Sequence, residues 1–290
     1  PHLLVFGYGY TARRLGAQLR LQGWDVTGTT RSPKRAEALE TEGIRGLVFD
    51  PAEGPSDEVR DAVRNATHLL DSIPTRAEGD PVLRHLGDEV REAAGRRLSW
   101  MAFLSTTGVY GEHHGGWVDE ETPPRPGLER TRLRLAAEDG WAALSGETGV
   151  PLQIYRIAGI YGPGQSVLDR LRDGSARRIV KPGSVFNRIH VDDIVGAILA
   201  GMAHPEVTGP INLADDLPAP GNEVMEHACA LLGIEPPPAV PFAEAGLSHL
   251  GRSFYAEDRR VRNTRLKEAL GYRLRYPTYR EGLAALLKVA

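Results

Sequence analysis

The chain has 290 residues and a formal net charge of -3, with 25% of its residues charged. This length allows one large or two small domains with a sizeable core. The charge balance indicates neither a nucleic-acid surface nor an acidic tail. A single cysteine, Cys229, excludes an internal disulfide framework and a cysteine metal cluster. It lies in an apolar helical stretch, so we expect it in the core.

No apolar run approaches the ~20 residues of a membrane span. The first residues enter a predicted strand at once, so we expect no signal peptide. We therefore expect a soluble, cytoplasmic α/β protein that acts on a small-molecule substrate and binds neither nucleic acid nor membrane.

The first thirty-one residues organise the prediction. Residues 2–6 form a short apolar run typical of a buried strand, and the turn Gly7-Tyr8-Gly9-Tyr10-Thr11-Ala12 follows it directly. Apolar residues then recur at helical spacing until Gly23, and residues 24–30 are typical of a second strand. This is a strand–turn–helix–strand unit with a Gly-x-Gly-x-x-Ala turn.

Each small residue of the turn has a role in binding a dinucleotide. Gly7 permits the tight turn, Gly9 lets a pyrophosphate approach the backbone, and Ala12 lets the helix pack on the strand. The helix N-terminus then directs its N–H groups at the phosphates. We predict cofactor contacts along the whole turn, from Gly7 through Tyr8, Gly9, Tyr10, Thr11 and Ala12. An ordinary glycine-containing turn is the alternative.

The end of the second strand indicates which dinucleotide binds. An Asp or Glu here would hold the ribose 2′-hydroxyl of NAD, but the chain has Thr30 and then Arg31, with Lys34 and Arg35 nearby. A guanidinium binds a 2′-phosphate through charge-assisted hydrogen bonds. We predict NADP rather than NAD, with contacts from Thr30, Arg31 and Arg35. The alternative is that these cations belong only to a solvated helix start.

Strands and helices alternate along the next hundred residues. Strands are expected at residues 47–50, 98–104 and 152–156, and residues 67–74 are expected to form a strand and the loop that follows it. Helices are expected at residues 57–65, 81–97 and 129–145. This alternation predicts a doubly wound parallel sheet with its ligand beyond the strands' carboxyl ends. The cofactor residues expected at those ends are Asp50, Ser72, Ile73, Pro74, Ser105, Ala158 and Gly159. Asp50 either reaches the adenine amino group or only starts the turn through Pro51.

After Tyr161 the alternation breaks down and the segments shorten. Helices are expected at residues 192–202, 222–232 and 264–270. We predict a dinucleotide-binding domain of residues 1–160 plus 187–204, and a smaller substrate lobe of residues 161–186 plus 205–290.

Four segments together resemble the extended short-chain dehydrogenase/reductase family, the NAD-dependent epimerases and dehydratases. They are Ser105–Gly111 (STTGVYG), Trp117–Pro123 (WVDEETP), Arg156–Gly164 (RIAGIYGPG) and Arg188–Ile194 (RIHVDDI). The resemblance spans nearly the whole chain. It implies that Thr106 hydrogen-bonds a substrate carbonyl and that Arg188 contacts a diphosphate, and we place Thr107 at the substrate as well. It also implies a homodimer formed through the helices at 81–97 and 129–145.

The chain departs from this family at the residues that move protons. The family's Tyr-x-x-x-Lys pair precedes a Leu-Ala-Ala-Glu run, which here is residues 135–138, so its two positions hold Arg130 and Arg134. A guanidinium stays protonated at ordinary pH and cannot replace the tyrosine. Arg134 could bind a ribose hydroxyl or phosphate. Alternatively, Arg130, Arg134 and Glu138 form a solvated ion-pair row.

Several other side chains are candidates for the missing acid/base group. Tyr110 could replace the tyrosine, although the resemblance makes it a packing residue. His113 and His114 lie in a glycine-rich loop, where adjacent histidines are usually only polar loop residues. The segment from His190 to Asp193 resembles a structural part of the family and predicts a capped helix rather than a metal site.

The chain thus resembles an atypical branch of the family that keeps the cofactor cleft without the catalytic pair. Two functions remain open. The first is an NADP-dependent oxidoreductase or epimerase-like enzyme acting on a small polar or nucleotide-linked substrate, with Thr106 and Tyr110 as candidate catalytic residues. The second is a non-catalytic NADP-binding redox sensor or regulatory protein.

Overall fold

The computed structural model describes residues 1–288 and divides into two compact units. Unit 1 comprises Pro1–Thr106, Glu129–Arg156 and Ile198–Ile211, and unit 2 comprises Thr107–Leu128, Ile157–Ala197 and the chain from Asn212 onward. These units differ from the predicted domains at residues 107–128, 157–160 and 187–197, which belong to unit 2, and at 205–211, which belong to unit 1. Residues 107–128 belong to unit 2 because their strand β7 (Trp117–Val118) pairs with β14 (Arg260–Val261).

Unit 1 is built on an eight-stranded sheet with the order β12-β8-β6-β5-β1-β2-β3-β4. The strands are β1 (His2–Phe6), β2 (Asp25–Thr30), β3 (Arg45–Asp50), β4 (Gly54–Pro55), β5 (His68–Asp71), β6 (Trp100–Thr106), β8 (Leu152–Ile157) and β12 (Gly209–Leu213). The strands from β6 through β5, β1 and β2 to β3 are parallel, and β4 is antiparallel to β3. The predicted doubly wound α/β class is confirmed.

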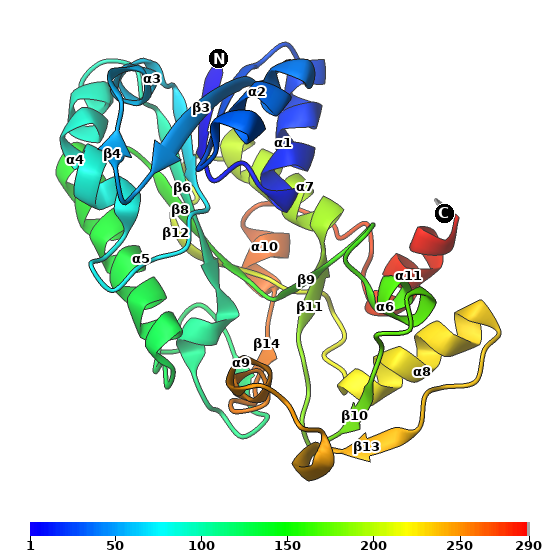
Figure 1. Cartoon of the computed structure of the whole chain (residues 1–290). Coiled ribbons are helices and arrows are strands. Elements are labelled where there is room, and N and C mark those ends of the chain that lie inside the picture. The colour runs from blue at the N-terminus through cyan, green and yellow to red at the C-terminus, as the bar shows by residue number, and fades with distance from the viewer. Residues whose placement is uncertain (289–290) are drawn as a thin grey trace. The chain divides into compact units, whose positions relative to one another are not determined.

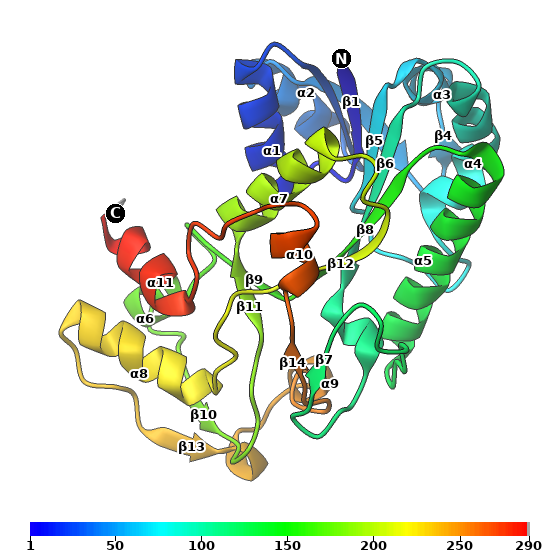
Figure 2. The same ribbon diagram turned by 180° about the vertical axis from the view of Figure 1, so that it is seen from behind.

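Helices cover both faces of this sheet (Figures 1 and 2). The helices α1 (Tyr10–Leu21) and α2 (Pro33–Thr41) lie on one face. The helices α3 (Asp57–Asn65), α4 (Pro81–Ala94) and α5 (Glu129–Thr148) pack side by side on the other. Their apolar stripes form one core with the strands, in which Trp141 and Phe103 lie fully buried, as expected for amphipathic helices on a sheet.

Unit 2 contains shorter elements. They are a 3₁₀ turn at Thr107–Tyr110, β7, β9 (Gly159–Tyr161), α6 (Val167–Arg172), β10 (Arg178–Val180), β11 (Arg188–His190), the start of α7 (Val191–Ala203), α8 (Gly221–Leu232), β13 (Ala239–Pro241), a 3₁₀ turn at Phe242–Glu244, α9 (His249–Ser253), β14, α10 (Thr264–Glu268) and α11 (Tyr279–Leu287). The helices α6, α8 and α11 enclose a second core that includes Cys229. The expected core placement of this cysteine is confirmed.

Within residues 1–288, no helix is both long and apolar enough to span a bilayer. The same residues contain no group of three His, Cys, Asp or Glu side chains arranged to hold a metal ion.

Candidate functional site

The turn after β1 is locked by its neighbours in unit 1. Gly7 has a φ of +81°, a conformation that favours glycine, and a Cβ there would lie 2.9 Å from the Ser72 hydroxyl oxygen. The Ser72 hydroxyl donates to the carbonyl oxygens of Phe6 (3.0 Å) and Gly7 (2.7 Å). The Gly7 N–H donates to the Thr29 hydroxyl at 3.1 Å. The fold itself therefore requires glycine at this position.

The fold does not require glycine at position 9 as it does at position 7. Its φ of -98° and ψ of -154° are extended backbone that other residues adopt, and a Cβ would meet nothing closer than the Gly7 carbonyl oxygen at 3.9 Å. Gly9 is exposed and immediately precedes α1, whose first turn has no side-chain cap and no acidic residue. The surface above Gly9 is therefore open and lies at the positive end of a helix dipole.

Tyr8 faces the opposite way, into the fold. Its ring is packed so closely between α1 and β2 that a Cβ on Gly16 would lie 1.9 Å from its hydroxyl oxygen, and one on Gly28 2.5 Å from the ring. The Tyr8 N–H donates to the Thr29 carbonyl at 2.9 Å. Burial raises the pKa of the Tyr8 hydroxyl to about 12. Tyr8 therefore shapes the turn from inside, and its predicted place among the cofactor contacts stays a prediction.

The predicted cations gather at the end of β2. The side chains of Arg31, Lys34 and Arg35 are exposed, and none of the three forms an ion pair within the described residues. The Thr30 hydroxyl is engaged by Ser32, accepting from its N–H and donating to its carbonyl oxygen. This strand end therefore offers uncompensated positive charge and no carboxylate.

Asp50 starts a turn at the end of β3. Its carboxylate accepts the Ala52 N–H at 3.0 Å, which is the local role that the sequence left open. A pocket of about 280 Å³ opens beside this turn. It is lined by Pro51, Ala52, Arg76, Glu78, Gly79, Pro81, Arg84 and His85.

A buried charge cluster that the sequence did not indicate lies at the end of β5. Asp71 is fully buried at the end of β5, and Asp80, 5% exposed, begins α4. Arg134 of α5 lies close to both and donates to the carbonyl oxygens of Ile73 (3.1 Å) and Leu104 (3.3 Å). Arg134 thereby joins the ends of β5 and β6. Its prediction as a ribose or phosphate ligand is untested, but the interpretation as part of a solvated row is wrong.

A second buried network fixes the end of β6. The Ser105 hydroxyl donates to Glu138, and Glu138 forms a two-pronged ion pair with Arg156 of β8, with a closest approach of 2.7 Å. Glu138 and Arg156 are 3% and 4% exposed, so Glu138 is not the solvated residue that its spacing suggested. The arginine within the mostly apolar strand at 152–157 is the feature of the sequence that could have indicated this network.

Five further predicted residues, Thr107, Tyr110, Ala158, Gly159 and Arg188, lie in unit 2. Tyr110 is fully buried and donates its hydroxyl to Asn212 at 2.8 Å, a placement that favours packing over acid catalysis. Arg188 donates to the carbonyl oxygens of Phe186 (2.9 Å) and Ala219 (3.0 Å). Thr107 is buried, the Ala158 N–H donates to Leu213, and the Gly159 N–H donates to Asn187. The substrate role of Arg188 and Thr107 stays a prediction.

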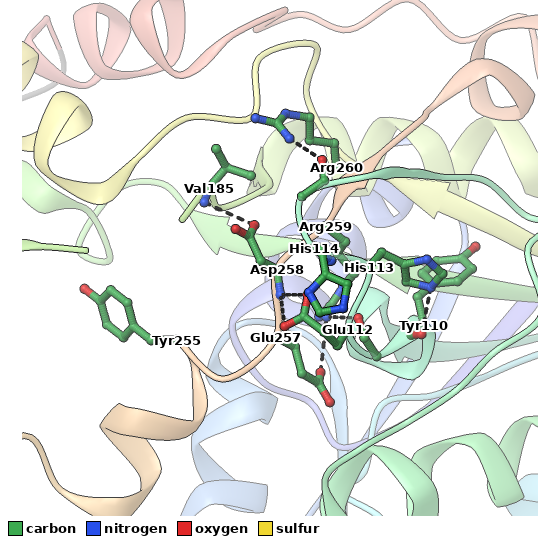
Figure 3. Close-up of polar contacts among 12 residues, drawn as sticks. Tyr110, Glu112, His113, His114, Val185, Tyr255, Glu257, Asp258, Arg259 and Arg260 are labelled. Atoms are coloured by element: carbon green, nitrogen blue, oxygen red, sulfur yellow. Dashed lines mark hydrogen bonds and ion pairs between the residues drawn. The ribbon is translucent and has the colours of Figure 1, made fainter. Parts of the chain in front are cut away.

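Figure 3 shows the loop that carries the two histidines. The N–H of His113 donates to the Asp258 carbonyl at 3.0 Å, and Glu112 accepts the Asp258 N–H at 3.1 Å. His113 also meets the Tyr110 carbonyl at 3.1 Å, whereas the His114 side chain is 93% exposed. The loop is thus held by the segment before β14.

The chain was compared with known proteins. No protein-family model matches it. A solved protein from Silicibacter pomeroyi, described as functionally unknown and conserved, is 46% identical, with a TM-score of 0.89 over 99% of this chain and 98% of that one. The chain belongs to the same family as this protein.

Two curated relatives lie further away and match over almost their full length. Protein YeeZ of Escherichia coli K12 is 27% identical over 278 residues, covering 94% of this chain and 95% of that protein. A 3-diazoavenalumate denitrifying reductase of a Streptomyces species is 29% identical over 308 residues, covering 97% and 98%.

More distant solved structures share the fold. MoeE5, solved with UDP-glucose and NAD, has a TM-score of 0.76 at 22% identity over 99% of this chain and 98% of that one. The human epimerase family protein SDR39U1, solved with NADPH, has a TM-score of 0.75 at 18% identity over 99% of both chains. The fold is therefore that of the short-chain dehydrogenase/reductase epimerases, which confirms the resemblance seen in the sequence.

Proposed function

We propose that unit 1 binds NADP(H), with the pyrophosphate over Gly9 at the start of α1. The observation that carries this proposal is the contrast between the two turn glycines. The fold explains Gly7, but neither backbone strain nor crowding explains Gly9. A ligand that must approach the backbone at the uncapped start of α1 does explain Gly9, and a phosphate is the group that such a helix terminus favours.

The preference for NADP rests on the end of β2. Thr30 stands where NAD sites place a carboxylate, and the exposed Arg31 and Arg35 supply donors for a 2′-phosphate. The structures of MoeE5 with NAD and of SDR39U1 with NADPH support a nicotinamide dinucleotide in this fold. Because one holds NAD and the other NADPH, these structures do not decide between the two cofactors, and the preference for NADP rests on the residues of this chain.

The proposed activity is an oxidoreductase or epimerase-like reaction on a small polar or nucleotide-linked substrate, and the reductase relative favours reduction. The nicotinamide supplies or accepts a hydride when bound. In this proposal Thr106, at the end of β6, orients the substrate carbonyl through its hydroxyl group. Arg130 and Arg134 cannot release a proton at ordinary pH, so in this proposal the proton comes from water or from a group other than the usual tyrosine.

Reversing the charge of Arg31 tests the cofactor assignment. We expect Arg31→Glu to weaken NADPH binding by about 10- to 100-fold, because a charge-assisted bond worth roughly 1.5–3 kcal/mol is lost and repulsion is added. NADH binding should stay unchanged or improve. Fluorescence titration of both cofactors measures this. Arg97→Glu, which reverses an exposed charge in the turn before β6, is the matched control. An equal loss for NADPH and NADH would contradict the assignment.

A non-catalytic NADP sensor is the second candidate. It is favoured by Arg134, which stands at the position of the family's lysine and whose hydrogen bonds join the ends of two strands. The two candidates separate when the protein is mixed with NADPH and a panel of aldehydes, ketones and nucleotide sugars while absorbance is followed. The enzyme predicts turnover that falls by about 10- to 100-fold in Thr106→Ala, the loss of one or two substrate hydrogen bonds. Tight NADPH binding without turnover across the panel would favour the sensor.

A further inference from the structure

Asp71 and Asp80 form a buried carboxyl pair. One oxygen of Asp71 accepts the Ile73 N–H at 2.9 Å, and one oxygen of Asp80 accepts the N–H groups of Val82 (2.9 Å) and Leu83 (3.0 Å). The second oxygen of each group is buried and has no donor among the described residues. Two such oxygens in contact are satisfied together when they share one proton, because adjacent buried carboxylates cannot both ionise.

The charged groups around the pair favour a state in which the two carboxyl groups hold one proton between them. Burial raises the pKa of Asp71 well above its usual range, and the negative charge of Asp80 raises it further. The groups that face the pair are the Ile73 N–H and the Arg134 guanidinium, and Glu138 faces Arg134 from the same helix. A pair that holds one proton carries one negative charge, which Arg134 balances. Without the proton, one negative charge is left unbalanced in a buried place.

The pair joins the two ends of the loop at residues 72–80. Asp71 precedes the loop, and Asp80 closes it and caps α4. The loop's first residue, Ser72, holds the Gly7 turn through its hydroxyl. Its later residues Arg76 and Gly79 line the pocket beside the end of β3. Whatever separates the pair therefore moves a loop that supports the phosphate-binding turn.

We propose that one proton shared by Asp71 and Asp80 holds the loop at 72–80 in the position that supports nucleotide binding, and that losing this proton at alkaline pH releases the loop. Asp71 and Asp80 are positioning residues: they act through Ser72 on the Gly7 turn. The ligand in this inference rests on the proposed function, whereas the shared proton does not.

The test compares the unmodified protein with Asp80→Asn, whose amide N–H replaces the shared proton while its oxygen still caps α4. NADPH binding to the unmodified protein should weaken by about tenfold for each pH unit above the pKa of the pair. Asp80→Asn should lack this additional loss, and Asp71→Asn gives a second such variant. Asp88→Asn, an exposed change on the same helix, should behave like the unmodified protein.

Infrared spectroscopy gives a readout that does not depend on the nucleotide. The unmodified protein at neutral pH should show the carbonyl stretch of a buried protonated carboxyl group, and both Asn variants should lose it. If this band is absent, or if the pH profiles of the unmodified protein and Asp80→Asn coincide, the inference is overturned. If the band is present but NADPH does not bind at any pH, the proposed function fails while the shared proton stands.

Discussion

Gly9→Asp should abolish NADPH binding and at the same time stabilise the folded protein. The backbone at Gly9 is extended and a Cβ has room there, so the fold accepts the change. Asp is a favoured N-cap residue, and its charge interacts well with the uncapped start of α1, which together should add about 0.5–1 kcal/mol to the free energy of unfolding. The same carboxylate would occupy the proposed pyrophosphate site and repel the phosphates, so affinity should fall by at least about 100-fold.

Because Gly9→Asp should raise stability but lower NADPH affinity, a loss of binding cannot be attributed to unfolding. Chemical denaturation measures the stability and calorimetric titration measures the binding. Gly7→Ala is the contrasting variant, because it strains a backbone with φ of +81° and should lose stability. If Gly9→Asp binds NADPH as well as the unmodified protein, the phosphate site is not at the start of α1.

Removing Arg156 should produce the largest loss of stability. Arg156→Met leaves the Glu138 carboxylate buried beside the ends of β6 and β8 without its ion-pair partner. Breaking a buried pair on one side typically costs about 3–5 kcal/mol, because an uncompensated charge remains. Urea denaturation followed by circular dichroism should show a midpoint that shifts accordingly.

Two controls separate the buried charge from other effects. Glu147→Ala breaks the exposed ion pair with Arg91, whose side chains are 54% and 45% exposed, and should cost less than about 1 kcal/mol. Replacing both buried partners, as Glu138→Leu with Arg156→Met, should recover much of the loss because no charge stays buried. If Arg156→Met lowers the free energy of unfolding no more than Glu147→Ala does, the buried ion pair does not contribute strongly to the stability of the sheet at β6 and β8.

The parallel sheet was predictable because its pattern is local. Apolar runs of four to seven residues alternate with amphipathic helices, and the helix expected at residues 57–65 begins and ends in the structure at the same residues. The pattern failed at α2 and in most of the short strands and helices after Tyr161, although the short helix α10 lies within the predicted range 264–270. There, segments of two to six residues, such as β14 and α6, depend on partners distant in the sequence.

In the candidate site, too, the local motif was predictable from the sequence and the contacts between distant residues were not. The turn from Gly7 to Ala12 has a spacing that identifies it without tertiary information, and the structure gives it an uncapped helix. The pair of Asp71 and Asp80 was not predictable, because the two residues are nine positions apart in the chain and only the closure of a loop brings them together. Likewise, periodicity placed Glu138 on an exposed row, but a partner on β8 buries it. Local spacing cannot reveal such a partner.

The most direct test of the account is a crystal structure of the protein grown with NADP. We predict the pyrophosphate against the backbone of Gly9 and the first turn of α1, and the 2′-phosphate beside Arg31. Nucleotide density elsewhere, or a 2′-phosphate that contacts neither Arg31 nor Arg35, would contradict it.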